Sequence, residues 1–154
     1  MTEELVASLR SFTRDLRPPA LDDLGAVASI RRLLDHLEAR SGIQWDMKVK
    51  GTQRRLHRDT ELGLYRIAQE AIRNVERHAQ ATAIWVNLSF HPNTVALQVR
   101  DNGKGFAWPQ PKAGPNSGLG LIGIQERATH LAGAVVVESA PGQGAVISAT
   151  IPVR

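Results

Sequence analysis

The 154-residue sequence contains no cysteine, and aromatic residues make up only 5% of it. Without cysteine the chain can form neither a disulfide nor a thiolate metal site, and it has no cysteine nucleophile. So few aromatic side chains argue against a platform that stacks the bases of single-stranded nucleic acid. The sequence also lacks a secretory signal and any apolar run near the roughly 18 residues of a membrane span. These absences favour a cytoplasmic protein.

The residues that are present have the balance of an ordinary globular domain. Hydrophobic residues make up 42% of the chain and charged residues 22%, and a chain of this length can bury a proper core as one domain. The formal net charge of +4 suits a polyanionic ligand such as a nucleotide. Because the basic residues are scattered along the chain, a solvated basic surface explains the charge equally well, and we expect no nucleic-acid partner.

Hydrophobic periodicity predicts a fold built from both helices and strands. Apolar residues recur at helical spacing in residues 2–16, 23–41, 58–79 and 119–132. Short or alternating apolar stretches between turn residues predict strands at residues 43–49, 82–90, 94–100, 134–139 and 145–152. Residues 107–117 hold three prolines and no periodicity, which predicts a loop. The order of the elements predicts an α/β two-layer sandwich, with helices on one face of a mixed, mostly antiparallel sheet.

The predicted helix at residues 58–79 carries a polar stripe at the edge of its apolar face. At roughly 100° per residue, Glu70, Asn74 and His78 fall on this stripe, and three arginines lie on the next sector toward solvent: Arg66, Arg73 and Arg77. A solvated edge is the plain interpretation. However, the Asn74 oxygen suits a hard cation such as Mg²⁺ that bridges phosphates, and Glu70 is placed to orient a metal-bound water or polarise an attacking group.

Two glycine pairs follow at places where a nucleotide can approach the backbone. Asp101 ends a strand, and its carboxylate suits the exocyclic amine of adenine. Gly103 and Gly105 permit positive φ and a close approach to a flat ring. Gly118 and Gly120 open a helix, whose amino end favours phosphate. Neither pair is a Walker A loop or a dinucleotide fingerprint. Taken with the helix before them, the pairs predict one nucleotide site.

The order of these motifs resembles the catalytic, ATP-binding domain of bacterial sensor histidine kinases, within the Bergerat-fold ATPase superfamily. Residues 69–79 resemble the N box of that family, residues 101–105 its G1 box and residues 118–121 its G2 box. The resemblance implies that Glu70 and Asn74 are catalytic, that Asn74 ligates Mg²⁺, and that ATP contacts a larger set: Asn74, Arg77, His78, Asp101, Gly103, Gly105, Gly118, Leu119, Gly120 and Leu121. Arg77 stands where many relatives have lysine.

The segment at residues 16–25 resembles the junction of the nitrate-sensor-like subfamily. The resemblance implies two parts: residues 1–17 as the tail of a dimerisation helix, and residues 18–154 as the catalytic ATP-binding domain. In that subfamily the phosphorylated histidine precedes the junction, where this sequence has no histidine. The histidines present do not sit in its motif: His36, His57, His78, His91 and His130. We therefore expect a fragment or one half of a split kinase.

The expected reaction is transfer of the γ-phosphate of ATP to a histidine on a helix outside this chain, and from there to a response regulator. We expect the parent kinase to be a homodimer, whether or not a membrane anchors it. Two alternatives stay open from the sequence. One is a Bergerat-fold ATPase that hydrolyses ATP with Glu70 as a general base. The other is a non-enzymatic interaction module that binds nucleotide.

Overall fold

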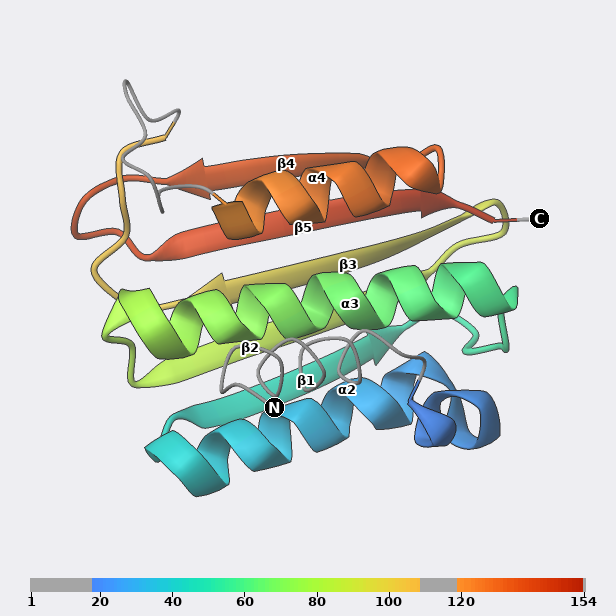
Figure 1. Cartoon of the computed structure of the whole chain (residues 1–154), viewed down its shortest axis with the longest axis horizontal. Coiled ribbons are helices and arrows are strands. Elements are labelled where there is room, and N and C mark those ends of the chain that lie inside the picture. Colours follow the sequence, from blue (N-terminus) through green and yellow to red (C-terminus); the bar gives the residue numbers. More distant parts are fainter. Residues whose placement is uncertain (1–17, 109–118, 154) are drawn as a thin grey trace, which may run out of the picture.

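The computed structural model describes residues 18–108 and 119–153, which form one open sheet and a layer of helices (Figure 1). The elements follow in the order α2 (Pro19–Ser41), β1 (Gln44–Lys50), α3 (Arg58–Asn74), a π-helical turn η1 (Val75–Ala79), β2 (Ala83–Phe90), β3 (Thr94–Asp101), α4 (Leu119–His130), β4 (Ala134–Ser139) and β5 (Ala145–Pro152). The helix predicted at residues 2–16 lies outside the described residues. In the described part, no helix is long and apolar enough to cross a membrane.

The sheet is mixed, with strand order β1-β2-β3-β5-β4. Only β1 and β2 run parallel, and the connection between them passes through α3 and η1, as a parallel pair requires. The pairs β2–β3, β3–β5 and β4–β5 are antiparallel. The predicted fold class is therefore confirmed, and the predicted strand limits agree with the observed ones to within one residue.

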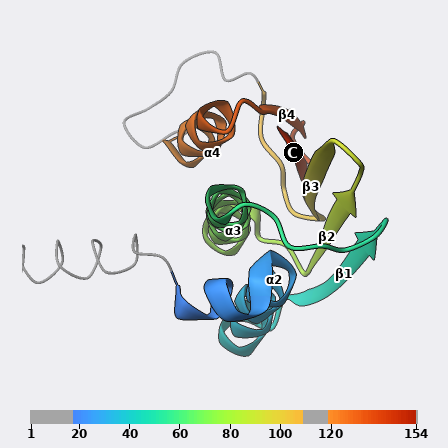
Figure 2. The same ribbon diagram turned by 90° about the vertical axis from the view of Figure 1, so that its right-hand side faces the viewer.

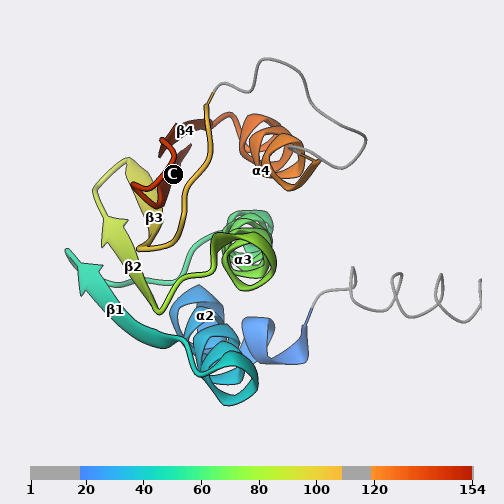
Figure 3. The same ribbon diagram turned by 90° about the vertical axis from the view of Figure 1, so that its left-hand side faces the viewer.

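The helices α2, α3 and α4 lie on the same face of the sheet, as the two side views show (Figures 2 and 3). Alternate strand residues point into the layer between them, and this alternation is regular in β2 and β3. The buried set includes Leu64, Ile67, Ala68, Ile84, Val86, Leu88, Leu97 and Ile151. Polar groups occupy the other face of the sheet, where Asn87 hydrogen-bonds Gln98.

The start of α2 differs from the prediction. The sequence predicted a helix from residue 23, but the helix begins at Pro19 and Gly25 interrupts it with φ 86° and ψ 178°. Proline suits the first position of a helix because its missing N–H would have no partner there. Arg55 stabilises the short first segment by donating to the carbonyls of Leu21 and Asp22 and to the buried Glu61.

The prediction that Arg66, Arg73 and Arg77 lie toward solvent is wrong for Arg66. Arg66 is only 4% exposed, and its guanidinium donates to Gln69 Oε1 at 2.9 Å and lies 5.6 Å from the Tyr65 ring centroid. The long aliphatic part of an arginine can be buried when its polar end keeps partners. Helical periodicity alone does not reveal such partners.

Candidate functional site

Two polar residues of α3 and the start of α4 meet at one end of the helix layer. A Cβ atom placed on Gly120 would lie 2.7 Å from Glu70 Oε1 and 2.8 Å from Asn74 Oδ1. With glycine at this position, α4 can approach the polar stripe without displacing these two side chains. The structure thus brings together the N-box residues and the second glycine pair, although more than 40 residues of sequence separate Asn74 from Gly120.

Glu70 and Asn74 are both half-buried on the side of α3 that faces α4. The Glu70 carboxylate lies 3.6 Å from Arg73 Nη1, one helical turn away. A carboxylate and an amide side by side offer oxygen ligands, the type that Mg²⁺ prefers. Among the described residues, no group of three or more histidine, aspartate or glutamate side chains is placed to hold a metal ion. An ion at Asn74 would therefore take most of its ligands from phosphate and water.

Asp101 ends β3 as a buried carboxyl group, 7% exposed. Its Oδ1 accepts a hydrogen bond from the Gly103 N–H at 2.8 Å. Burial raises the pKa of Asp101 above its ordinary value, and hydrogen bonds from the backbones of Gly103 and Ala145 offset part of this rise. A buried carboxylate held by backbone donors is a well-oriented acceptor, which suits a ligand that presents an amine.

Gly103 and Gly105, the first glycine pair, pack against the backbones of Ala79 and Ala140. A Cβ on Gly103 would lie 2.2 Å from the Ala79 carbonyl oxygen, at the end of η1. Gly105 has φ +64°, which confirms the positive φ expected there, whereas Gly103 is not among the positive-φ residues. Its close approach to Ala79 is the reason for glycine at position 103. The approach of these glycines to a bound ring stays a prediction.

The turn between β4 and β5, which joins two of the predicted strands, belongs to the same region. The Gly142 N–H donates to the Lys104 carbonyl at 2.6 Å. A Cβ on Gly144, which has φ +67°, would lie 2.2 Å from the Asp101 carbonyl oxygen. Ser139 Oγ accepts from the Phe106 N–H at 2.9 Å. The only sequence signal for these contacts was the glycine spacing of the turn.

The remaining predicted ATP contacts have different surroundings. Arg77 and His78 are exposed on η1, beside the end of α3, and π-helical turns within helices often occur at functional sites. Leu121 is buried in the core, so its contact with nucleotide stays a prediction. Leu119 begins α4, and Gly118 lies outside the described residues.

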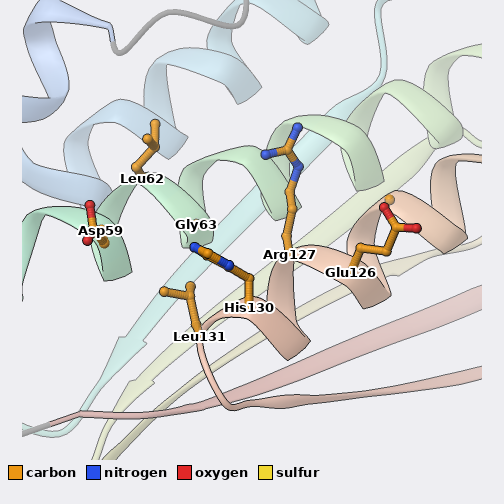
Figure 4. A pocket seen from close by; sticks show the side chains of 8 residues that line it. Asp59, Leu62, Gly63, Glu126, Arg127, His130 and Leu131 are labelled. Atoms are coloured by element: carbon orange, nitrogen blue, oxygen red, sulfur yellow. The ribbon is translucent and has the colours of Figure 1, made fainter.

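A separate cavity of about 390 Å³ lies between the first turns of α3 and the last turns of α4 (Figure 4). Asp59, Glu126, Arg127 and His130 give its lining charges of both signs. Because α3 and α4 are antiparallel, with Gly63 against Leu131 at this end, the cavity lies at the opposite end of the helix pair from Gly120. None of the predicted site residues lines it.

The proteins and the family model that this chain matches are described as histidine kinases or as a family that includes them. A family model described as histidine kinase-, DNA gyrase B-, and HSP90-like ATPase matches residues 59–154. The signal transduction histidine-protein kinase/phosphatase DegS of Brevibacillus brevis is 33% identical over 153 residues, which are 99% of this chain and 39% of that protein. The sensor histidine kinase MctS of Rhizobium johnstonii is 37% identical over 147 residues, 96% of this chain and 32% of that protein.

Two solved structures share the fold at lower identity. The mycobacterial sensor histidine kinase MprB matches with a TM-score of 0.62 and 23% identity, over 83% of this chain and 94% of the MprB chain. Full-length ShkA in complex with AMPPNP matches with a TM-score of 0.67 and 22% identity, over 82% of this chain and 29% of the ShkA chain.

Proposed function

The chain belongs to the family of histidine kinase-, DNA gyrase B-, and HSP90-like ATPases and is the catalytic, ATP-binding domain of a sensor histidine kinase. On that premise we propose that it binds ATP–Mg²⁺ where α3, β3 and α4 meet, and that it donates the γ-phosphate to a histidine outside these residues. The contact of Gly120 with Glu70 and Asn74 carries this proposal, because it joins separate motifs into one site.

In this proposal the two ends of the site have different tasks. Asp101 accepts a hydrogen bond from the amino group of adenine, close to Gly103 and Gly105. The amino end of α4, at Leu119 to Leu121, binds phosphate through backbone N–H groups and the positive end of its dipole, and Gly118, which precedes it in the sequence, is proposed to take part. Arg77 and His78 are exposed nearby on η1, and they are available to a polyanionic ligand. The complex of ShkA with AMPPNP supports a nucleotide in this fold.

Mg²⁺ fits this site through Asn74, with Glu70 beside it. Mg²⁺ is usually held by one or two protein oxygens together with substrate phosphates and water, so the sparse set of protein ligands is what such an ion needs. When bound, the ion would neutralise charge on the β- and γ-phosphates. The task of Glu70 is to orient a water molecule or the attacking group.

The wider role is also part of the proposal, because the chain spans only 39% and 32% of the length of DegS and MctS. We propose that residues 1–17 are the tail of a dimerisation helix and that residues 18–154 form the catalytic domain. The phosphoacceptor histidine then lies on a helix of the parent kinase, which acts as a homodimer. A response regulator would receive the phosphoryl group.

Titration of ATP by calorimetry, with and without Mg²⁺, tests the metal assignment. Asn74→Ala should abolish the gain in ATP affinity that Mg²⁺ gives to the wild-type protein, while its unfolding midpoint stays close to the wild-type value. Asn87→Ala is the matched control, since Asn87 lies on the far face of the sheet and bonds Gln98. An unchanged effect of Mg²⁺ in Asn74→Ala would contradict the assignment.

Incubation with γ-labelled ATP separates transfer from hydrolysis. The chain alone should bind ATP without acquiring an acid-labile label, because the histidine that accepts phosphate is proposed to lie elsewhere. Stable label on the chain would contradict that part of the proposal. Steady release of labelled phosphate without any acceptor would instead support the alternative in which Glu70 is the general base for hydrolysis.

A further inference from the structure

Ser139 is the last residue of β4, and its hydroxyl joins two turns that meet at Asp101. Its Oγ accepts a hydrogen bond from the Phe106 N–H at 2.9 Å and donates one to the Gly144 carbonyl at 2.8 Å. Phe106 follows the turn that begins at Asp101, and Gly144 ends the β4–β5 turn. One half-buried hydroxyl therefore ties the loop after β3 to the loop before β5.

The two turns pack closely against each other. A Cβ on Gly105 would lie 2.2 Å from the Ala140 carbonyl oxygen and 2.7 Å from that of Gly144. A Cβ on Gly144 would lie 2.2 Å from the Asp101 carbonyl oxygen. Backbone packed this closely can be held in register by a short side chain, and serine is short enough to satisfy one donor and one acceptor in the gap.

Each hydrogen-bond partner of Ser139 lies in a segment that also contacts the Asp101 carboxylate. On one side, the loop that contains Phe106 also contains Gly103, whose N–H donates to Asp101 Oδ1 at 2.8 Å. On the other side, Gly144 precedes Ala145, whose backbone also hydrogen-bonds the Asp101 carboxyl group. The hydroxyl thus bonds both segments that carry the backbone donors of this carboxylate, at Phe106 and at Gly144.

We infer that Ser139 is a positioning residue for base recognition, which acts through Asp101 and does not touch the nucleotide itself. The inference rests on the proposed function, since it assumes that Asp101 accepts a hydrogen bond from the amino group of adenine. Guanine carries a carbonyl oxygen at the corresponding position, which a carboxylate cannot recognise in the same way. Ser139 therefore contributes to the preference for ATP over GTP.

The test measures the affinities of ATP, GTP and inorganic tripolyphosphate by calorimetry in the presence of Mg²⁺. Ser139→Ala removes both hydrogen bonds, and we expect the ratio of ATP to GTP affinity to fall about tenfold. The affinity of tripolyphosphate should stay at the wild-type value, because the phosphate end of the site is built from α3 and α4. A merely structural role would weaken all three ligands together.

Three further variants make the result specific. Ser139→Cys keeps the size of the side chain but forms weaker hydrogen bonds, so it should behave like Ser139→Ala. Ser139→Thr keeps the hydroxyl and suits a strand, so it should restore the ATP preference to within about twofold. Ser148→Ala is the matched control, because Ser148 lies on β5 and bonds Gln98 on the far face of the sheet. Thermal unfolding of each variant confirms that it is folded.

The outcomes distinguish this inference from the proposed function. If the wild-type protein binds no ATP, the proposed function fails. If it binds ATP and Ser139→Ala or Ser139→Cys keeps the wild-type ATP-to-GTP ratio, only the positioning role is overturned. Equal losses for ATP, GTP and tripolyphosphate in a folded Ser139→Ala protein would also overturn it. So would a folded Ser139→Thr protein that shows the same loss as Ser139→Ala.

Discussion

Replacing Gly120 with alanine should separate the stability of this domain from its ability to bind Mg²⁺–ATP. The added Cβ would lie 2.7 Å from Glu70 Oε1, 2.8 Å from Asn74 Oδ1 and 2.9 Å from Asn74 Nδ2. Ordinary contacts of a Cβ begin at 3.4 Å. Both side chains must therefore give way at their polar ends. The backbone of α4 can stay in place, because all three atoms belong to side chains.

The expected change in the free energy of unfolding is small. Alanine in place of glycine within a helix stabilises by up to about 1 kcal/mol, and less near a helix end. Moving the Asn74 side chain about 30° from its preferred rotamer costs on the order of 0.5–1.5 kcal/mol. These two effects are of similar size and opposite sign, so we expect Gly120→Ala to unfold in urea within about 1 kcal/mol of the wild-type protein.

Binding should respond much more strongly than stability. If the displaced Asn74 oxygen no longer reaches the metal, a charge-assisted contact worth roughly 1.5–3 kcal/mol is lost, which is a loss of about ten- to a hundredfold in affinity. Calorimetric titration of ATP with Mg²⁺ measures this loss. Without Mg²⁺, the difference between the variant and the wild-type protein should be much smaller.

Gly123→Ala is the matched control for this experiment. Gly123 lies in the same helix, and a Cβ there would meet no other atom within 4 Å. Gly123→Ala should gain at least as much helix propensity as Gly120→Ala and leave ATP binding unchanged. Unaltered Mg²⁺–ATP affinity in Gly120→Ala would refute the assignment of Asn74 and Glu70 to the site. An equal loss of affinity in Gly123→Ala would show that α4 as a whole, and not the contact at Gly120, governs binding.

Other substitutions test the surrounding contacts. Because burial raises the pKa of Asp101, the wild-type protein should lose stability relative to Asp101→Asn as the pH rises from the ordinary value of 3.8 through the raised pKa. Urea unfolding over a pH series measures this, and a wild-type protein that gains stability relative to Asp101→Asn over that pH range would contradict it. Gly103→Ala should destabilise by about 1–3 kcal/mol in urea, because its Cβ would meet the Ala79 carbonyl; an unchanged midpoint would argue against that contact. Arg55→Ala should lower the melting temperature more than Glu61→Gln, since it leaves the buried Glu61 carboxylate without its cation; the reverse order would contradict this.

Local patterns predicted the elements of the fold because burial in this sheet is regular. In β2, every second residue from Ile84 to Phe90 is buried, and the same alternation in the sequence is what predicted the strand. The polar stripe of α3 was predicted on similar grounds, and Glu70 and Asn74 do lie together beside Gly120. Arg66 shows the limit of this reasoning. Its partners are Gln69 and the Tyr65 ring, and such partners are not visible in a hydrophobic pattern.

The least predictable part of the site is the packing of one turn on another. A glycine in a sequence indicates that a side chain is absent, but it does not indicate which atom occupies the space. Gly103 accommodates the Ala79 carbonyl, and Gly144 accommodates the Asp101 carbonyl. Each glycine is therefore required by a residue on another element of the fold. The approach of Gly144 to Asp101 depends on the pairing of β3 with β5, which sets Asp101 opposite Ala145. The orientation of the Asp101 carboxylate is therefore a property of the assembled sheet, and its dependence on Ser139 could be recognised only from the tertiary structure.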